Sequence, residues 1–150
     1  MKMTPEDYDA LVDLPLSLGG KSIWAYIRKY PELVTPELPE AMVRWADAAA
    51  RAEDMQPAAR AYYEASEVWR HLGDHEQTLL QQVKYLDCKF MLVKDPEFVG
   101  RDAHRQLREA RRLKLLDIAF RLATLEADCI FFAARAKGDN ESEKYCWIRY

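Results

Sequence analysis

The rest of the chain is organised around the stretch AARAYYEASEVWRHLGDHEQTLLQQVKYL, from Ala58 to Leu86. Its apolar residues recur at steps of three and four on both sides of Gly73, which is the period of an amphipathic helix. Gly73 suits the left-handed position that follows a helix end, and Asp74 can cap the next helix. We therefore expect two antiparallel helices that pack apolar stripe against apolar stripe. A hairpin of this size cannot bury its outer faces alone, so we expect neighbouring helices on both sides of it.

The composition favours a folded, helix-rich chain. Hydrophobic residues make up 49% and charged residues 31% of the 150 residues, and five glycines are few for a sheet protein with many tight turns. The formal net charge of -3 provides no overall attraction to nucleic acid or anionic membrane. No run reaches the roughly 18 apolar residues of a membrane-spanning helix, and the first residues lack the apolar core of a signal peptide. We expect a cytoplasmic protein without membrane contact.

A helix-start pattern occurs three times outside the central stretch. Each copy places a residue that can cap a helix before a proline and an acid, which is the order expected at a helix N-terminus. The three copies are Thr4-Pro5-Glu6, Thr35-Pro36-Glu37 and Asp95-Pro96-Glu97.

These signals predict one all-α domain over residues 1–150. We expect N-terminal helices in 1–34, central hairpins in 35–94 and C-terminal hairpins in 95–150. The long helical pattern after Pro96 exceeds the usual length of one helix, which favours a break between Arg111 and Asp117. The last predicted helix, Glu141 to Tyr150, has no end signal, so we expect the chain to be a domain of a longer protein or a stable fragment.

A second stretch is similar to the one that follows the central hinge. GDHEQTLLQQVKY from Gly73 and GDNESEKYCWIRY from Gly138 share Gly, Asp, Glu and the final Tyr, at an offset of 138 - 73 = 65 residues. This offset is close to twice the roughly 34-residue period of some helical-hairpin repeats. The similarity favours stacked hairpins, and a chance likeness between two helix turns stays the alternative.

The hairpin from Ala58 to Leu86 resembles a tetratricopeptide repeat. Tyr62 stands where that repeat has an early aromatic residue, Ser66 where it has a small residue and Trp69 where it has a second aromatic residue. The resemblance implies a solenoid of stacked antiparallel hairpins that binds a peptide segment or a partner domain in a groove. The departures from the pattern, which leave the spacing and curvature open, are Thr78, Gln82, Tyr85 and Phe131.

The same resemblance implies a set of binding residues. In tetratricopeptide repeats the outward face of each first helix lines the groove. The mixed charges and the aromatic ring at the matching positions suit an extended peptide with polar side chains. The implied binding residues are Arg60, Tyr63, Glu67, Arg70 and His71.

An alternative role comes from the segment YPELVTPE at residues 30–37. It resembles the linker-like sequence HPELLTPE near the start of helical-repeat regions in large bacterial multidomain proteins. This resemblance implies a regulatory or sensing segment that packs on the catalytic module of its own protein.

Four arginines form a stripe along the helix predicted after Pro96. They recur at steps of four, three and four, so they line one helix face, and only Asp102 and Glu109 oppose the local positive charge. Such a stripe can hold phosphates or an acidic peptide, or it can be a solvated face. The acidic total charge and the lack of interleaved aromatic residues argue against nucleic acid. The stripe is Arg101, Arg105, Arg108 and Arg112, flanked by Arg111 and Lys114.

No motif points to catalysis, to a cofactor or to a metal. The chain lacks a glycine-rich phosphate loop, a GxSxG elbow and an HExxH pair, and His71 and His75 are separated by the Gly73 turn. Three widely spaced cysteines without a CxxC pair predict free thiols. We expect a non-enzymatic scaffold that binds a protein or peptide. Self-association is also expected if the solenoid lacks a polar end cap.

Overall fold

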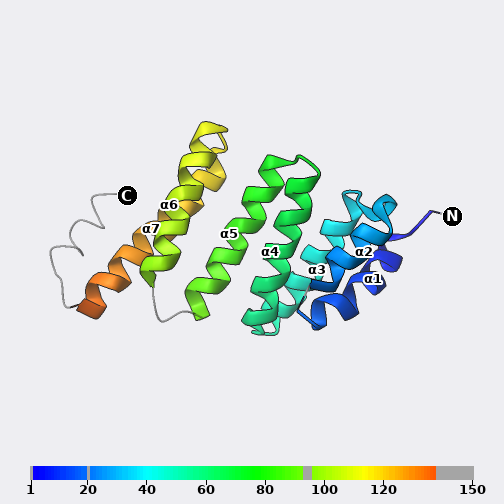
Figure 1. Cartoon of the computed structure of the whole chain (residues 1–150). Coiled ribbons are helices and arrows are strands. Elements are labelled where there is room, and N and C mark those ends of the chain that lie inside the picture. Colours follow the sequence, from blue (N-terminus) through cyan, green and yellow to red (C-terminus); the bar gives the residue numbers. More distant parts are fainter. Residues whose placement is uncertain (1, 20, 93–95, 138–150) are drawn as a thin grey trace. The chain divides into compact units, whose positions relative to one another are not determined.

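The fold is all α in the part of the chain that the computed structural model describes, residues 2–19, 21–92 and 96–137, with the backbone alone at 21, 22 and 137. These residues form seven α-helices and one short 3-10 helix without any strand, which confirms that the fold is all α (Figure 1). The contacts divide the chain into two compact units, Met1–Cys88 and Lys89–Tyr150. The predicted single domain over 1–150 stays a prediction. Within the described ranges, no helix is long and apolar enough to cross a membrane.

The first unit begins with helix α1, Pro5–Ser17, which starts as the sequence predicts. The Thr4 hydroxyl accepts a hydrogen bond from the Asp7 amide, and the Asp7 carboxylate accepts one from the Thr4 amide. This reciprocal capping box satisfies two backbone donors at the helix start. The helix continues through Pro15 before it ends. Three elements follow, namely α2 (Lys21–Lys29), the 3-10 helix η1 (Pro31–Leu33) and α3 (Glu37–Arg51).

The expected cap of α3 by Thr35 is wrong. Pro36 is the N-cap residue of α3, and no side-chain hydrogen bond closes this helix start. The Thr35 hydroxyl instead lies 3.3 Å from the hydroxyl of Tyr8 on α1. It also hydrogen-bonds the Glu37 carboxylate, and this contact lowers the pKa of Glu37. Thr35 therefore ties the start of α3 to α1. The third predicted cap, Asp95, lies outside the described residues.

The predicted central hairpin is confirmed as α4, Met55–His71, followed by α5, His75–Leu92. The apolar stripe of α4 is buried, and Trp69 is 6% exposed. Helix α4 packs on α3, and its Tyr62 hydroxyl donates to the Asp47 carboxylate of that helix. The Asp74 carboxylate accepts a hydrogen bond from the Gln77 amide at 3.0 Å, as expected for a cap of α5.

The second unit contains the hairpin of α6, Pro96–Arg112, and α7, Leu116–Lys137. The break between them falls within the predicted window. The two helices pack closely, since a Cβ atom added to Gly100 would lie 3.0 Å from the Cβ of Cys129. Helix α6 has one buried stripe, made of Val99, Ala103, Leu107 and Ala110.

Three helix ends share one backbone turn. After α3, α4 and α6, the second residue beyond the helix has a positive φ, and the residues concerned are Glu53, Gly73 and Lys114. In each turn this residue donates to the carbonyl three residues earlier, and the next residue donates to the carbonyl five residues earlier. These two bonds define the Schellman motif. Only one of the three turns uses glycine, so the sequence marks only one of them clearly.

The hairpins α4–α5 and α6–α7 repeat at an offset of 114 - 73 = 41 residues. At this offset the bounds of α4 coincide with those of α6, and the first residue of α5 coincides with that of α7. The four buried positions of α6 all fall on buried positions of α4. The segments LDCKF (86–90) and ADCIF (127–131) also align. The predicted repeat at an offset of 65 residues stays a prediction, because its second copy begins at residue 138 and lies outside the described residues.

Candidate binding faces

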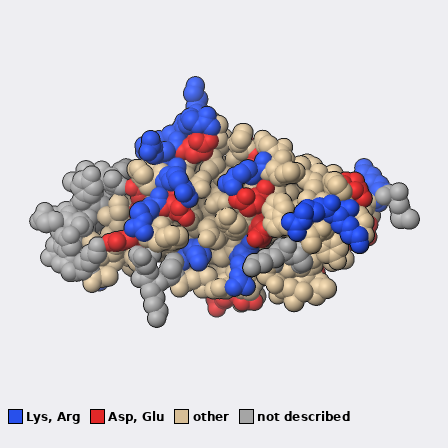
Figure 2. Space-filling model, in the orientation of Figure 1, with Lys and Arg blue, Asp and Glu red and all other residues tan. Residues whose placement is uncertain are grey.

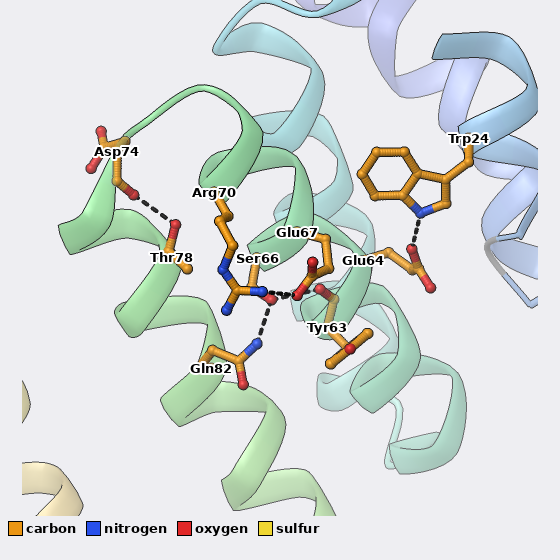
Figure 3. Close-up of polar contacts among 9 residues, drawn as sticks. All are labelled: Trp24, Tyr63, Glu64, Ser66, Glu67, Arg70, Asp74, Thr78 and Gln82. Carbon is orange, nitrogen blue, oxygen red and sulfur yellow. Dashed lines mark hydrogen bonds and ion pairs between the residues drawn. The ribbon is translucent and has the colours of Figure 1, made fainter. Parts of the chain in front are cut away.

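The five groove residues implied by the tetratricopeptide resemblance lie on α4, on the side away from its buried stripe. Four of them are exposed, and the Glu67 side chain is 26% exposed. The Arg70 guanidinium donates to the Glu67 carboxylate at 2.5 Å, one helical turn away (Figure 3). Glu64 lies between these residues. We call this surface the α4 face, consisting of Arg60, Tyr63, Glu64, Glu67, Arg70 and His71.

Tyr63 is the aromatic centre of the α4 face. It is 41% exposed, and its ring centroid lies 5.2 Å from that of Tyr85 on α5. Behind it, the Ser66 hydroxyl donates to the Tyr63 carbonyl and accepts a hydrogen bond from the Gln82 amide at 2.7 Å (Figure 3). Gln82, one of the departures from the repeat pattern, therefore joins α5 to α4 through a buried polar contact. The Tyr85 ring thus covers part of the Tyr63 ring, and the remainder of Tyr63 is open to solvent.

Sequence reasoning missed Trp24 of α2 and its partner Glu64. The indole Nε1 donates to a Glu64 carboxylate oxygen at 2.5 Å, across 40 residues of sequence (Figure 3). Burial raises the pKa of Glu64, and the hydrogen bond from Trp24 opposes this effect. No local sequence signal could have paired these residues, because the contact depends on how α2 and α4 meet. It brings a second aromatic side chain to the edge of the α4 face.

Arg60 lies beside the connection between α1 and α2. A Cβ atom added to Gly19 would lie 3.7 Å from Nη1 of Arg60, and Gly19 has a φ of 101°. A glycine suits this position because other residues rarely adopt such a φ. The α4 face thus borders elements far from it in sequence.

The arginine stripe lies on α6 as predicted, and its own acids neutralise half of it. The Arg105 guanidinium contacts the Asp102 carboxylate at 2.6 Å. Arg112 binds the two carboxylate oxygens of Glu109 at 2.9 and 2.5 Å, and these hydrogen bonds raise the pKa of Arg112. Within the described residues, no ion pair holds the other basic side chains, Arg101, Arg108, Arg111 and Lys114. We call Arg101, Arg105, Arg108, Arg111, Arg112 and Lys114 the arginine face.

The two predicted sets of binding residues occupy the same positions of equivalent helices. At the 41-residue offset, each charged position of the α4 face falls on an arginine of α6. The sign of the charge is conserved at some of these positions and reversed at two of them. The pairs are Arg60 and Arg101, Glu64 and Arg105, Glu67 and Arg108, Arg70 and Arg111, and His71 and Arg112.

His104 of α6 takes the position of Tyr63. Its Nδ1 lies 3.2 Å from both carboxylate oxygens of Glu126 on α7, and the Glu126 side chain is 10% exposed. This contact joins the two helices of the second hairpin at the edge of the arginine face. His71 and His75 are exposed on the other hairpin.

The groups that most often carry chemistry are unreactive or dispersed in the described part of the chain. Cys88 and Cys129 are buried free thiols, as predicted, and they take equivalent positions of α5 and α7. Burial raises the pKa of both, to about 12 for Cys129, so each thiol is protonated at neutral pH. Cys146 lies outside the described residues. Among those residues, no group of three or more His, Cys, Asp or Glu could hold a metal ion.

Comparisons of the chain with protein-family models, with curated proteins and with solved structures found no match.

Proposed function

We propose that the chain is a non-catalytic binding module of tandem, tetratricopeptide-like hairpins, and that its α4 face binds an extended segment of a partner protein. The observation that carries this proposal is the half-exposed ring of Tyr63, which packs on the Tyr85 ring next to the Glu67–Arg70 pair. The 41-residue repeat supports tandem hairpins. Its period exceeds the roughly 34 residues of tetratricopeptide repeats, so the likeness lies in the layout of the hairpin.

The chemistry of the α4 face suits a polar peptide. Tyrosine, tryptophan and arginine dominate the binding energy of many interfaces, because they offer large contact areas and hydrogen bonds. Tyr63 and Trp24 supply aromatic surface, and Arg70 supplies a guanidinium that can move from Glu67 to a ligand carboxylate. A peptide laid across α4 would meet rings and charges in alternation.

The proposal can be tested by selecting peptides on the purified chain from a random 12-residue phage library. Binding of a selected peptide is then measured by fluorescence anisotropy. We expect Tyr63→Ser and Arg70→Glu each to weaken binding at least tenfold. Tyr26→Ser is a matched control, since Tyr26 is also 41% exposed but lines a hollow next to α1. Arg111→Glu controls for charge at the equivalent position of α6.

Two results would contradict the proposal. One is a selected peptide that binds both α4-face variants as tightly as the original chain. The other is a selection that enriches no peptide, which favours the alternative of a regulatory segment that packs on its own catalytic module. That alternative is carried by residues 30–37, which form η1 and the approach to α3.

A further inference from the structure

The arginine face differs from the α4 face in one chemical respect. Glu64 and Glu67 of α4 correspond to Arg105 and Arg108 of α6, while the equivalent positions at the ends of the two faces are basic or histidine. The equivalent helix faces therefore carry mixed charge on α4 and positive charge on α6. We propose that the arginine face binds an acidic protein segment. This inference concerns the second unit by itself and would stand even if the α4 face bound nothing.

The arginine face is turned away from the hairpin core. The buried residues of α6 pack on α7, whereas Arg101, Arg105, Arg108 and Arg112 are all exposed. The steps of four, three and four keep these four residues on the opposite side of the helix. Figure 2 shows Lys and Arg side chains gathered over α6, with fewer acids among them.

Two arginines already show how a carboxylate fits here. Glu109 is held by two hydrogen bonds from Arg112, and Asp102 by one from Arg105. Paired hydrogen bonds of this kind are the strong, directional form of arginine recognition. The open guanidinium groups of Arg101 and Arg108 are seven residues apart, which is about 10 Å along a helix axis. Three residues of a segment in the polyproline II conformation span about 9 Å, and this conformation places every third side chain on the same face. Acids at every third position would therefore meet both arginines.

The charge distribution favours a short acidic segment over nucleic acid. Residues 101–114 contain six basic and two acidic residues, with His104 neutral, so their net charge is 6 - 2 = +4. The rest of the chain carries -3 - 4 = -7. The rest of the chain therefore adds no net attraction for a long polyanion, whereas a short segment needs to contact α6 alone. The arginine face also lacks the aromatic side chains on which single-stranded bases stack.

The test measures fluorescence anisotropy of a labelled 12-residue peptide, four repeats of Glu-Ser-Ser, titrated with the full chain at low salt. We expect saturable binding that the double variant Arg101→Glu/Arg108→Glu weakens at least tenfold. The matched control Lys2→Glu/Arg28→Glu makes the same change in net charge at exposed residues of the first unit. It should weaken binding less than threefold.

A second variant, Arg101→Gln/Arg108→Gln, removes the charges without adding acids. It replaces the double glutamate variant in the test if that variant loses its helical circular dichroism signal. Each of the following results would overturn the inference: no saturable binding, equal binding of a Gln-Ser-Ser peptide, or equal weakening by the control variant. Tighter binding of a 12-nucleotide oligothymidine through the same arginines would overturn it in favour of nucleic acid.

Discussion

Helices α4 and α6 have the same length, end in the same type of turn and share four buried positions. They differ in the side chains that they bury and expose. Helix α4 buries eight residues, among them Tyr62 and Trp69, whereas α6 buries four, of which two are alanines. The exposed side carries mixed charges on α4 and arginines on α6. The comparison teaches that register and turn geometry define the hairpin, while the chemistry of its exposed face can change independently.

The greatest predicted loss of stability comes from Trp69→Ala, which tests the larger core of α4. Trp69 is buried, and its equivalent in α6 is Ala110. Trp69→Ala should lower the free energy of unfolding by about 3 to 5 kcal/mol, because it leaves a large cavity. Urea denaturation measures this loss. Phe120→Ala is the control, since Phe120 is 71% exposed, and it should cost less than about 0.5 kcal/mol. An unchanged midpoint for Trp69→Ala would show that the core of α4 is misassigned.

The next effect concerns the polar contact inside the first hairpin. Ser66→Ala should cost about 1 to 3 kcal/mol, because it leaves the buried Gln82 amide without its hydrogen bond. The equivalent pair in the second hairpin is Leu107 and Ala123, which are apolar. The double variant Ser66→Leu/Gln82→Ala copies this pair and should cost less than Ser66→Ala alone. If denaturation shows the double variant to be less stable than Ser66→Ala, the two hairpins are not equivalent at this pair of positions.

The shared turn predicts effects of opposite sign at equivalent positions. Gly73 has a φ of 80°, and nothing lies within 4 Å of an added Cβ, so Gly73→Ala should cost about 1 to 2 kcal/mol through backbone conformation alone. Lys114 has a φ of 59°, and Lys114→Gly should stabilise the second hairpin by roughly 0.5 to 1 kcal/mol. Thermal melting of both variants checks the signs. Equal signs would mean that the two turns are not equivalent.

The smallest effect depends on pH. Burial raises the pKa of Glu64, so the folded chain retains the proton to a higher pH than the unfolded chain does. Stability should therefore fall as the pH rises through the interval just above 4.5, the ordinary value of a glutamate. Glu64→Gln cannot ionise, and its amide oxygen can still accept the hydrogen bond from Trp24. The melting temperature of this variant relative to the original chain should be higher at pH 7 than at pH 4, and a difference independent of pH would contradict this account.

Local patterns in the sequence predicted much of the fold. The hinge at Gly73, the cap by Asp74 and the break between α6 and α7 all follow from periodicity and helix-end chemistry. The Trp24–Glu64 contact could not be predicted, because it depends on the orientation of two helices 40 residues apart. The 41-residue repeat was missed because few identities mark it and because Lys114 stands where a glycine would have signalled the turn.

The sequence predicted the positions of the candidate binding residues better than the equivalence of the two faces or the ion pairs within them. The tetratricopeptide resemblance placed one set on a helix face and periodicity placed the other. The structure exposes these residues there, apart from the partly buried Glu67. The sequence could not show that Glu67 and Arg108 are equivalent, since that equivalence follows from the bounds of the helices. Nor could it show which arginines are paired, because side-chain geometry decides whether Asp102 reaches Arg105.

Each hairpin contains a buried cysteine at an equivalent position, and the reactivity of this thiol can report when the hairpin opens. Cys88 lies on α5 and Cys129 on α7, and both thiols are inaccessible in the folded chain. A thiol reagent can therefore modify each cysteine only when the surrounding helices open. In chains that retain one cysteine at a time, the rate of labelling reports how often that hairpin opens. The protein thus contains two reporters with which the motions of its two repeats can be timed separately.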